Sequence, residues 1–147
     1  MNKFMKMAID EARTGIRSGH GGPFGCVIVC DGEVVGRGHN EVVRQNDPTC
    51  HGEVMAIRSA CKTLGKYDLS GCELYTTAQP CPMCAGAVQW ANISKVYYGC
   101  TVSDTDAIGF RDEVFFSSPE DISSELDREE CLELFAEYSS LPDKTAY

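Results

Sequence analysis

Hydrophobic and polar residues alternate along this chain with periods that predict helices and strands in turn. Residues 2–18 carry apolar side chains three or four positions apart, which is the spacing of one helix face, and the glycine-rich segment 19–22 marks the end of that helix. Asp31-Gly32 separates the apolar runs 24–30 and 33–39 and therefore predicts a β-hairpin. The remaining segments predict a helix over 51–64, a strand over 74–77, a short helix over 81–91, a strand over 94–100, a loop over 101–112, an acidic helix over 125–139 and a tail over 141–147. Strands that alternate with helices in this way favour an α/β sandwich.

The length and composition of the chain predict a single folded domain over residues 1–147. A chain of 147 residues is near the common size of one domain and can bury roughly 70% of the surface that it exposes when unfolded. The chain contains no apolar run of about 18 residues, so the sequence predicts no membrane span. The first 19 residues are amphipathic and do not have the apolar centre of a signal peptide. The nine cysteines indicate reduced thiols outside a small disulfide scaffold, so we expect a cytoplasmic protein without a membrane partner.

Charge is distributed unevenly between the two parts of the chain. Residues 1–100 contain ten basic and nine acidic residues, whereas residues 101–147 contain three basic and thirteen acidic residues. A polynucleotide would be repelled by this acidic end, and no basic stripe offsets the repulsion. We therefore expect a small substrate and no long nucleic acid.

The candidate chemistry lies at the first turns of two predicted helices. His51 precedes Glu53 by two residues, and Cys81 and Cys84 are one helical turn apart after Pro80. One imidazole and two thiolates are typical zinc ligands, and three protein ligands leave a fourth position for water, which Glu53 can reach as a proton carrier. This H-x-E…P-C-x-x-C pattern is the signature of zinc nucleobase deaminases. It predicts one zinc ion per chain, with His51, Cys81 and Cys84 as ligands and Glu53 as the catalytic acid and base.

A C-x-x-C pair also occurs in structural zinc knuckles and in redox motifs, so these two interpretations stay open. A structural site needs four protein ligands. The other histidines, His20 and His39, form no H-x3–5-H pair, and no second C-x-x-C is present. Cys50 lies next to His51, so spacing alone leaves a four-ligand site possible.

Beyond the zinc motif, the chain resembles the cytidine-deaminase-like superfamily over nearly its whole length. The matching segments are Gly22-Pro23-Phe24-Gly25, Gly38-His39-Asn40, Asn46-Asp47-Pro48-Thr49, His51-Gly-Glu53-Val-Met-Ala-Ile57, Leu74-Tyr-Thr-Thr77 and Pro80-Cys-Pro-Met-Cys-Ala-Gly-Ala87. Within the superfamily, the segment 104–112 and the terminal Tyr147 look most like the bacterial guanine deaminases. The resemblance implies a three-layer α/β sandwich with a five-stranded mixed sheet flanked by helices. It also implies a homodimer in which the tail 141–147 crosses to close the active site of the partner.

The same resemblance implies five substrate contacts. Asn40 would bond to a carbonyl or ring nitrogen of the base, Phe24 and Trp90 would pack against its ring, and Asp112 would accept from its exocyclic amino group. Tyr147 would close the pocket. Each residue also has a purely structural interpretation, since the two aromatic rings fit a core, Asn40 fits a turn, Asp112 fits a solvated surface and Tyr147 fits a frayed chain end.

The implied reaction is the zinc-dependent hydrolysis of a free nucleobase with a 2-amino-4-oxo edge. Guanine would give xanthine and ammonia, and isocytosine, which carries the same edge, would give uracil. Gly52 in the middle of H-x-E resembles fungal cytosine deaminases and keeps cytosine as an alternative. Two further alternatives are a tRNA or single-strand editing deaminase, which the acidic end argues against, and a silent zinc-stabilised binding protein, which has no need of Glu53.

Overall fold

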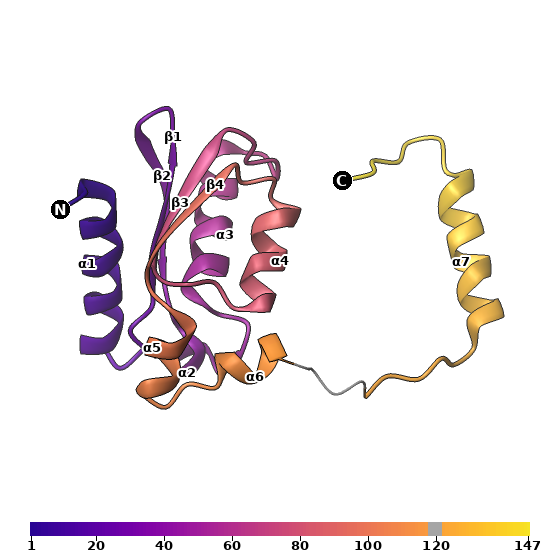
Figure 1. Cartoon of the computed structure of the whole chain (residues 1–147). Helices are drawn as coiled ribbons and strands as arrows, with labels where there is room; N and C mark the ends of the chain where they lie inside the picture. Colours follow the sequence, from indigo (N-terminus) through magenta and orange to yellow (C-terminus); the bar gives the residue numbers. More distant parts are fainter. Residues whose placement is uncertain (118–121) are drawn as a thin grey trace.

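In the computed structural model, helices cover both faces of a four-stranded sheet and one further helix projects away from this body (Figure 1). The structure describes residues 1–117 and 122–147. The strands are β1 (Gly25–Cys30), β2 (Glu33–His39), β3 (Cys72–Ala78) and β4 (Lys95–Cys100). The helices are α1 (Lys3–Arg17), α2 (Val42–Gln45), α3 (Gly52–Leu64), α4 (Pro82–Trp90), α5 (Val102–Ala107), α6 (Asp112–Ser117) and α7 (Arg128–Ser140).

The sheet is mixed and has the order β2-β1-β3-β4. Strand β1 pairs antiparallel with both β2 and β3, whereas β3 and β4 are parallel and are connected through α4. Alternate residues of β1 enter two different cores because successive side chains of a strand point to opposite faces. Val27 and Val29 pack with α1, and Cys26 and Ile28 pack with residues of α3 and α4. The α/β sandwich with a mixed central sheet is therefore confirmed.

Glycines allow the helices to approach the sheet closely near its functional edge. A Cβ atom at Gly38 of β2 would lie 2.5 Å from the backbone nitrogen of Ala56 in α3, and one at Gly25 of β1 would meet the backbone of α1. Real Cβ atoms do not make such contacts, so larger residues at either position would push a helix outward. Because α3 begins beside these glycines, they help to fix the first turn that carries Glu53.

The expected number of five strands is wrong for the described residues, which form four. The periodicity of the sequence predicted four strands, and the fifth came from the family resemblance. After β4 the chain does not continue as a loop or a strand but enters α5. The side chain of Thr101 accepts from the backbone of Asp104, and the Asp104 carboxylate accepts from Thr101 in return, which is a helix capping box. The segment expected as a loop over 101–112 is therefore largely helical.

The expectation that all cysteines are reduced is wrong for one pair. Cys30 ends β1 and Cys72 begins β3, and the strand register places them opposite each other with a Cα–Cα separation of 4.4 Å. The two residues form a disulfide, while the other seven cysteines are free. The composition of the chain could not reveal this pair, because only the register of β1 and β3 brings the two thiols together.

Helix α7 lies apart from the sheet, at the end of the segment that leaves α6 (Figure 1). Its apolar side chains are exposed, with Leu134 at 62% and Phe135 at 68% of full accessibility. The chain then returns towards the body, where the ring of Tyr147 lies 6.0 Å from that of Trp90 and 6.1 Å from that of Tyr67. Within the described residues, no helix has both the length and the apolar character needed to cross a membrane.

Candidate active site and metal centre

His51, Cys81 and Cys84 meet where the first turns of α3 and α4 converge. His51 immediately precedes α3, Cys81 immediately precedes α4, and Cys84 lies in the first turn of α4. The Nδ1 atom of His51 lies 3.6 Å from Sγ of Cys81 and 3.5 Å from Sγ of Cys84. All three ligand atoms lie within 4.8 Å of one another.

These separations fit a tetrahedral zinc ion. Zinc bonds of about 2.05 Å to nitrogen and about 2.3 Å to sulfur, at the tetrahedral angle, place a ligand nitrogen and sulfur about 3.6 Å apart. The two measured nitrogen–sulfur distances agree with this value without any movement of the side chains. The ring nitrogen of His51 that faces the two sulfur atoms is Nδ1, which the sequence could not specify.

The local sequence explains why two helices begin at this point. Cys81 has extended backbone angles, and Pro82 follows it at the first helical position, where a missing N–H has no cost. His51 has the same extended conformation in front of α3. The unpaired N–H groups of a helix start carry partial positive charge, which favours thiolates and other anions nearby.

The electrostatics of the cluster favour one thiolate that is ready to bind a cation. The pKa of Cys81 is lowered to about 4, chiefly because its thiolate accepts a hydrogen bond from Cys84, with a further contribution from His51. The same hydrogen bond, together with burial, raises the pKa of Cys84. The contact with Cys81 also raises the pKa of the His51 imidazole.

Glu53 is held in a buried position next to this cluster. It retains 5% of its accessible surface, and its Oε1 atom lies 3.3 Å from the hydroxyl of Thr76, which can donate to it. Burial raises the pKa of the Glu53 carboxyl, and the pKa values of His51 and Cys84 both respond to its charge. A buried carboxyl beside a metal site is placed to take a proton from one group and return it to another.

Asp112, Asn40 and Phe24 lie around the same region. Asp112 begins α6, and the charges of both Cys81 and His51 affect its pKa, which is raised mainly by burial. The buried Asn40 donates its backbone N–H to the carbonyl of Phe24 at 2.8 Å. A backbone hydrogen bond thus joins Asn40 and Phe24, two of the predicted substrate contacts. Asp112 comes near the cluster from α6, much later in the chain.

Trp90 and Tyr147 lie differently from the other predicted contacts. Trp90 ends α4, six residues and roughly 9 Å of helix rise beyond Cys84. It is 70% exposed, and its ring packs against that of Tyr147 from the same chain. Within the described residues, no ring contact joins either side chain to His51. This chain alone therefore does not bring Trp90 and Tyr147 to its own cluster.

The sequence did not indicate two side chains that help to form the site. Thr76 contacts Glu53 from β3, and nothing in the sequence of this strand distinguishes Thr76 from the other buried positions. Phe110 packs edge-on against Phe24, with ring centroids 4.9 Å apart, from a segment that was expected to be a loop. The capping-box pattern at Thr101 was a signal that the segment before Phe110 is ordered.

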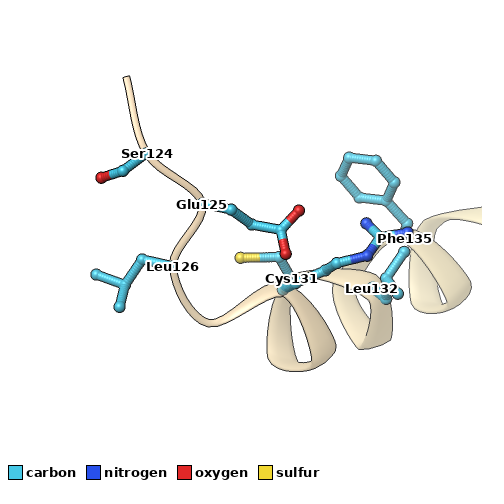
Figure 2. Close-up of a pocket in the computed structure, with 7 residues that line it drawn as sticks. Ser124, Glu125, Leu126, Cys131, Leu132 and Phe135 are labelled. Carbon is cyan, nitrogen blue, oxygen red and sulfur yellow. The ribbon is translucent and has the colours of Figure 1, made fainter. Parts of the chain in front are cut away.

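Figure 2 shows a hollow lined by residues of the C-terminal arm, the name we give to residues 122–147 with α7, and not by residues of the His51 cluster. It measures about 330 Å³ and is lined by residues of α7 and of the segment before it, including Leu126, Cys131, Leu132 and Phe135. A second hollow, of about 450 Å³, lies along the same helix beside Leu134 and Tyr138. None of the residues that line these hollows belongs to the cluster of His51, so we assign them no catalytic role.

Comparison with known proteins gives consistent results. The family model for the cytidine and deoxycytidylate deaminase zinc-binding region matches residues 1–100. The guanine deaminase of Bacillus subtilis is 49% identical over 113 residues, which are 77% of this chain and 72% of that protein. A tRNA-specific adenosine deaminase of Agrobacterium fabrum is 42% identical over 118 residues, covering 79% of this chain and 75% of that protein.

Solved structures show the same relationship. The X-ray structure of guanine deaminase from Bacillus subtilis has a TM-score of 0.92 and 40% identity, and the match covers 100% of this chain and 99% of that chain. A second neighbour, solved in complex with 2,6-diaminopurine, has a TM-score of 0.69 and 32% identity, and the match covers 74% of this chain and 61% of that one. Because the first match covers the whole chain, it includes the arm that contains α7.

Proposed function

The chain belongs to the cytidine and deoxycytidylate deaminase family, and from that premise we propose that it hydrolyses free guanine to xanthine and ammonia. The observation that supports this most directly is the placement of two acids around one zinc-type ligand cluster. Glu53 is buried beside the cluster, and Asp112 approaches it from α6. The first acid suits proton transfer, and the second suits recognition of an amino group.

We assign one zinc ion per chain to Nδ1 of His51 and the thiolates of Cys81 and Cys84. The family model describes a zinc-binding region, and the ligand distances support the assignment. Zinc held there would supply Lewis-acid activation of a water molecule at neutral pH.

Glu53 performs the proton transfers in this proposal. Its carboxylate takes a proton from the attacking water and passes it to a ring nitrogen of the base, and a further transfer allows the amine to leave as ammonia. The atoms of guanine and one water are thereby converted into xanthine and ammonia. The hydroxyl of Thr76 positions the carboxylate, and burial excludes the bulk water that would compete for these protons.

Recognition of the base is assigned to the residues around the cluster. Asp112 accepts hydrogen bonds from the amino group and a ring N–H, Asn40 bonds to the opposite side of the base, and Phe24 packs against its ring. Isocytosine presents the same edge and is the expected second substrate. A neighbour of known structure binds 2,6-diaminopurine, which supports a purine-sized ligand.

The structure gives Gly52 a role that does not involve cytosine. A Cβ atom at this position would lie 3.1 Å from the backbone oxygen of Phe24, which is tighter than an ordinary van der Waals contact. Close packing of α3 against the segment that carries Phe24 is therefore a sufficient reason for glycine, and it removes the main argument for cytosine as the substrate.

We also propose that two chains form a homodimer in which the arm of each chain packs on the other. Helix α7 lies apart from the sheet in a single chain (Figure 1), and its apolar side chains are exposed. Two hollows lie beside them, and Figure 2 shows the first. A helix with this much exposed apolar surface is stable when another surface covers it. In such a dimer, residues 141–147 bring Tyr147 to the partner chain, where it closes the pocket.

A substrate panel tests the proposed function. Purified protein is incubated with guanine, isocytosine, cytosine, adenine, their nucleosides and a tRNA anticodon stem-loop, and the release of ammonia is measured. We expect guanine to react fastest, isocytosine to follow, and the stem-loop to remain unchanged. Faster deamination of adenosine in the stem-loop than of guanine would favour the tRNA-editing relatives instead.

A further inference from the structure

A second group of metal-ligating side chains lies outside the proposed active site. It consists of His20 in the loop after α1, His39 at the end of β2, and Glu41 just before α2. Nδ1 of His20 lies 2.8 Å from Nε2 of His39, and Oε1 of Glu41 lies 3.8 Å from His39 Nε2 and 4.0 Å from His20 Nδ1. The three side chains retain 21%, 13% and 10% of their accessible surface, so the group is largely shielded from solvent.

The triangle formed by these three atoms can take a metal ion once the two rings turn, because the nearly parallel rings now face each other nitrogen to nitrogen, with centroids 5.1 Å apart. The point equidistant from its corners lies about 2.1 Å from each atom, which is the usual length of zinc bonds to imidazole nitrogen and carboxylate oxygen. Bonds from this point to the two nitrogens are nearly perpendicular. That angle suits a divalent first-row transition ion with five or six ligands, and imidazole nitrogen is a preferred ligand of these ions.

Surrounding residues hold His39 and the loop of His20 next to each other. Nδ1 of His39 lies 3.1 Å from Oε2 of Glu11, so this nitrogen carries the proton and donates to the carboxylate. Nε2 of His39 is therefore unprotonated, and its lone pair faces His20. A carboxylate behind a metal-ligating histidine is a usual feature of such sites. Gly15 makes room for the ring, because a Cβ atom there would lie 2.6 Å from Cδ2 of His39. The carbonyl of His20 accepts from the backbone of Val43, which ties the loop to α2.

We propose that His20, His39 and Glu41 bind a second divalent transition-metal ion, separate from the zinc of the active site. Without an ion, the short distance between the two rings is explained by an N–H of His20 that donates to His39. When the ion binds, Nδ1 of His20 gives up this hydrogen bond, and the ring carries its proton on Nε2 in the other neutral tautomer. Two carboxylates, Glu11 and Glu41, face this region. One cation, Arg44, opposes the ion, because its Nη1 donates to Oε1 of Glu41, the proposed ligand atom, at 2.7 Å. Arg44 is 57% exposed and is free to move into solvent.

Metal titration of the zinc-loaded protein tests this site. Protein that carries one zinc per chain is titrated with Co²⁺, followed by calorimetry, elemental analysis and visible absorption. We expect one further equivalent of cobalt, with ligand-field bands but no thiolate-to-metal charge transfer, because this site has no sulfur ligand. The melting temperature should rise as the site fills, because the ion binds the folded chain. A stoichiometry that stays at one metal ion per chain overturns the proposal.

Variants identify the ligands. His20→Gln keeps a polar side chain but should abolish binding of the second ion. Glu11→Gln should weaken it about 10- to 100-fold, the usual effect of removing a partner behind a metal-bound histidine. Arg44→Gln should tighten binding, because it removes the opposing cation. Asp10→Asn, a loss of one exposed carboxylate from the same helix as Glu11, is the control and should bind cobalt as the wild type does.

Two results of the variant series contradict the assignment. Unchanged cobalt binding by both His20→Gln and Glu41→Gln would show that the ion binds elsewhere. A thiolate charge-transfer band that accompanies the added cobalt would show that the metal has entered the cysteine site. If His20→Gln does not fold, Glu41→Gln gives the same test, and zinc retained at the first site confirms that the variant is folded.

Discussion

Replacement of Glu53 by Gln separates proton transfer from metal binding at the proposed active site. Glutamine has nearly the same shape as glutamate, so it fills the buried position without a cavity. It cannot take a proton from water at neutral pH. Since His51, Cys81 and Cys84 are unchanged, zinc should remain at the wild-type level while turnover is lost.

The expected magnitude follows from the environment of the carboxylate. A single general acid–base group contributes about 10²- to 10⁴-fold to a rate, or about 2.7 to 5.5 kcal/mol of activation free energy. Glu53 is 95% shielded from solvent, and in the described part of the chain the only hydroxyl that donates to it is that of Thr76. Because bulk water has little access to replace the lost carboxylate, we expect Glu53→Gln to reach at least the middle of that range, roughly 10³-fold.

Thr76→Val is the matched control for this prediction. It removes the hydroxyl but leaves the carboxylate able to accept a proton. The hydroxyl is shared between Glu53 at 3.3 Å and the carbonyl of Ala78 at 3.2 Å, so its loss should cost about 1 kcal/mol or about fivefold in kcat/KM.

The assay measures ammonia release from guanine together with zinc content by elemental analysis. If Glu53→Gln retains more than about a tenth of the wild-type rate while zinc is fully bound, Glu53 is not the proton carrier. If the variant loses zinc, the loss of activity has another origin and the assignment of Glu53 as a non-ligand is wrong.

Three further predictions concern the metal, the substrate and the arm. Cys84→Ala should lose zinc and lower the melting temperature, because metal binding is coupled to folding, and full zinc occupancy would refute the ligand assignment. Asp112→Asn should reduce kcat/KM for guanine about 10- to 150-fold through the loss of a charged hydrogen bond, and an equal loss for every base would refute its role in recognition. Deletion of residues 143–147 should lower kcat/KM more than tenfold with zinc retained, and mixing with Glu53→Gln chains should restore activity if the arm closes the partner's site. Unaltered kinetics of the truncated protein would leave Tyr147 without a role.

The sequence predicted most of the fold where one local signal was decisive. Short apolar runs next to turn residues located β1, β2, β3 and β4, and Asp31-Gly32 formed the expected turn with positive φ at both residues. The zinc-type cluster followed from the motif, because the motif places His51 at one helix start and Cys81 and Cys84 at another, and the fold brings the two starts together. The identity of the ligating nitrogen of His51 did not follow, since ring orientation depends on packing.

The remaining features depended on long-range register or on contacts outside local patterns. The Cys30–Cys72 disulfide requires the alignment of β1 with β3, which no local signal gives. The contact of Thr76 with Glu53 also requires the placement of α3 over the sheet. In contrast, the helix after Thr101 was readable from its capping box, and its assignment as a loop ignored that signal.

The two clusters are linked through Asn40, and this link gives the second site a consequence for catalysis. His39 and Glu41 flank Asn40 in the chain and both belong to the second cluster, while the backbone of Asn40 is bonded to Phe24. An ion that binds both neighbours restricts the backbone of Asn40, because each peptide bond is planar and leaves two rotations per residue. Filling the second site should therefore change KM for guanine more than kcat, since the role proposed for Asn40 is to hold the base and not to transfer a proton. Equal kinetic constants with the second site empty and full would show that the two clusters act independently.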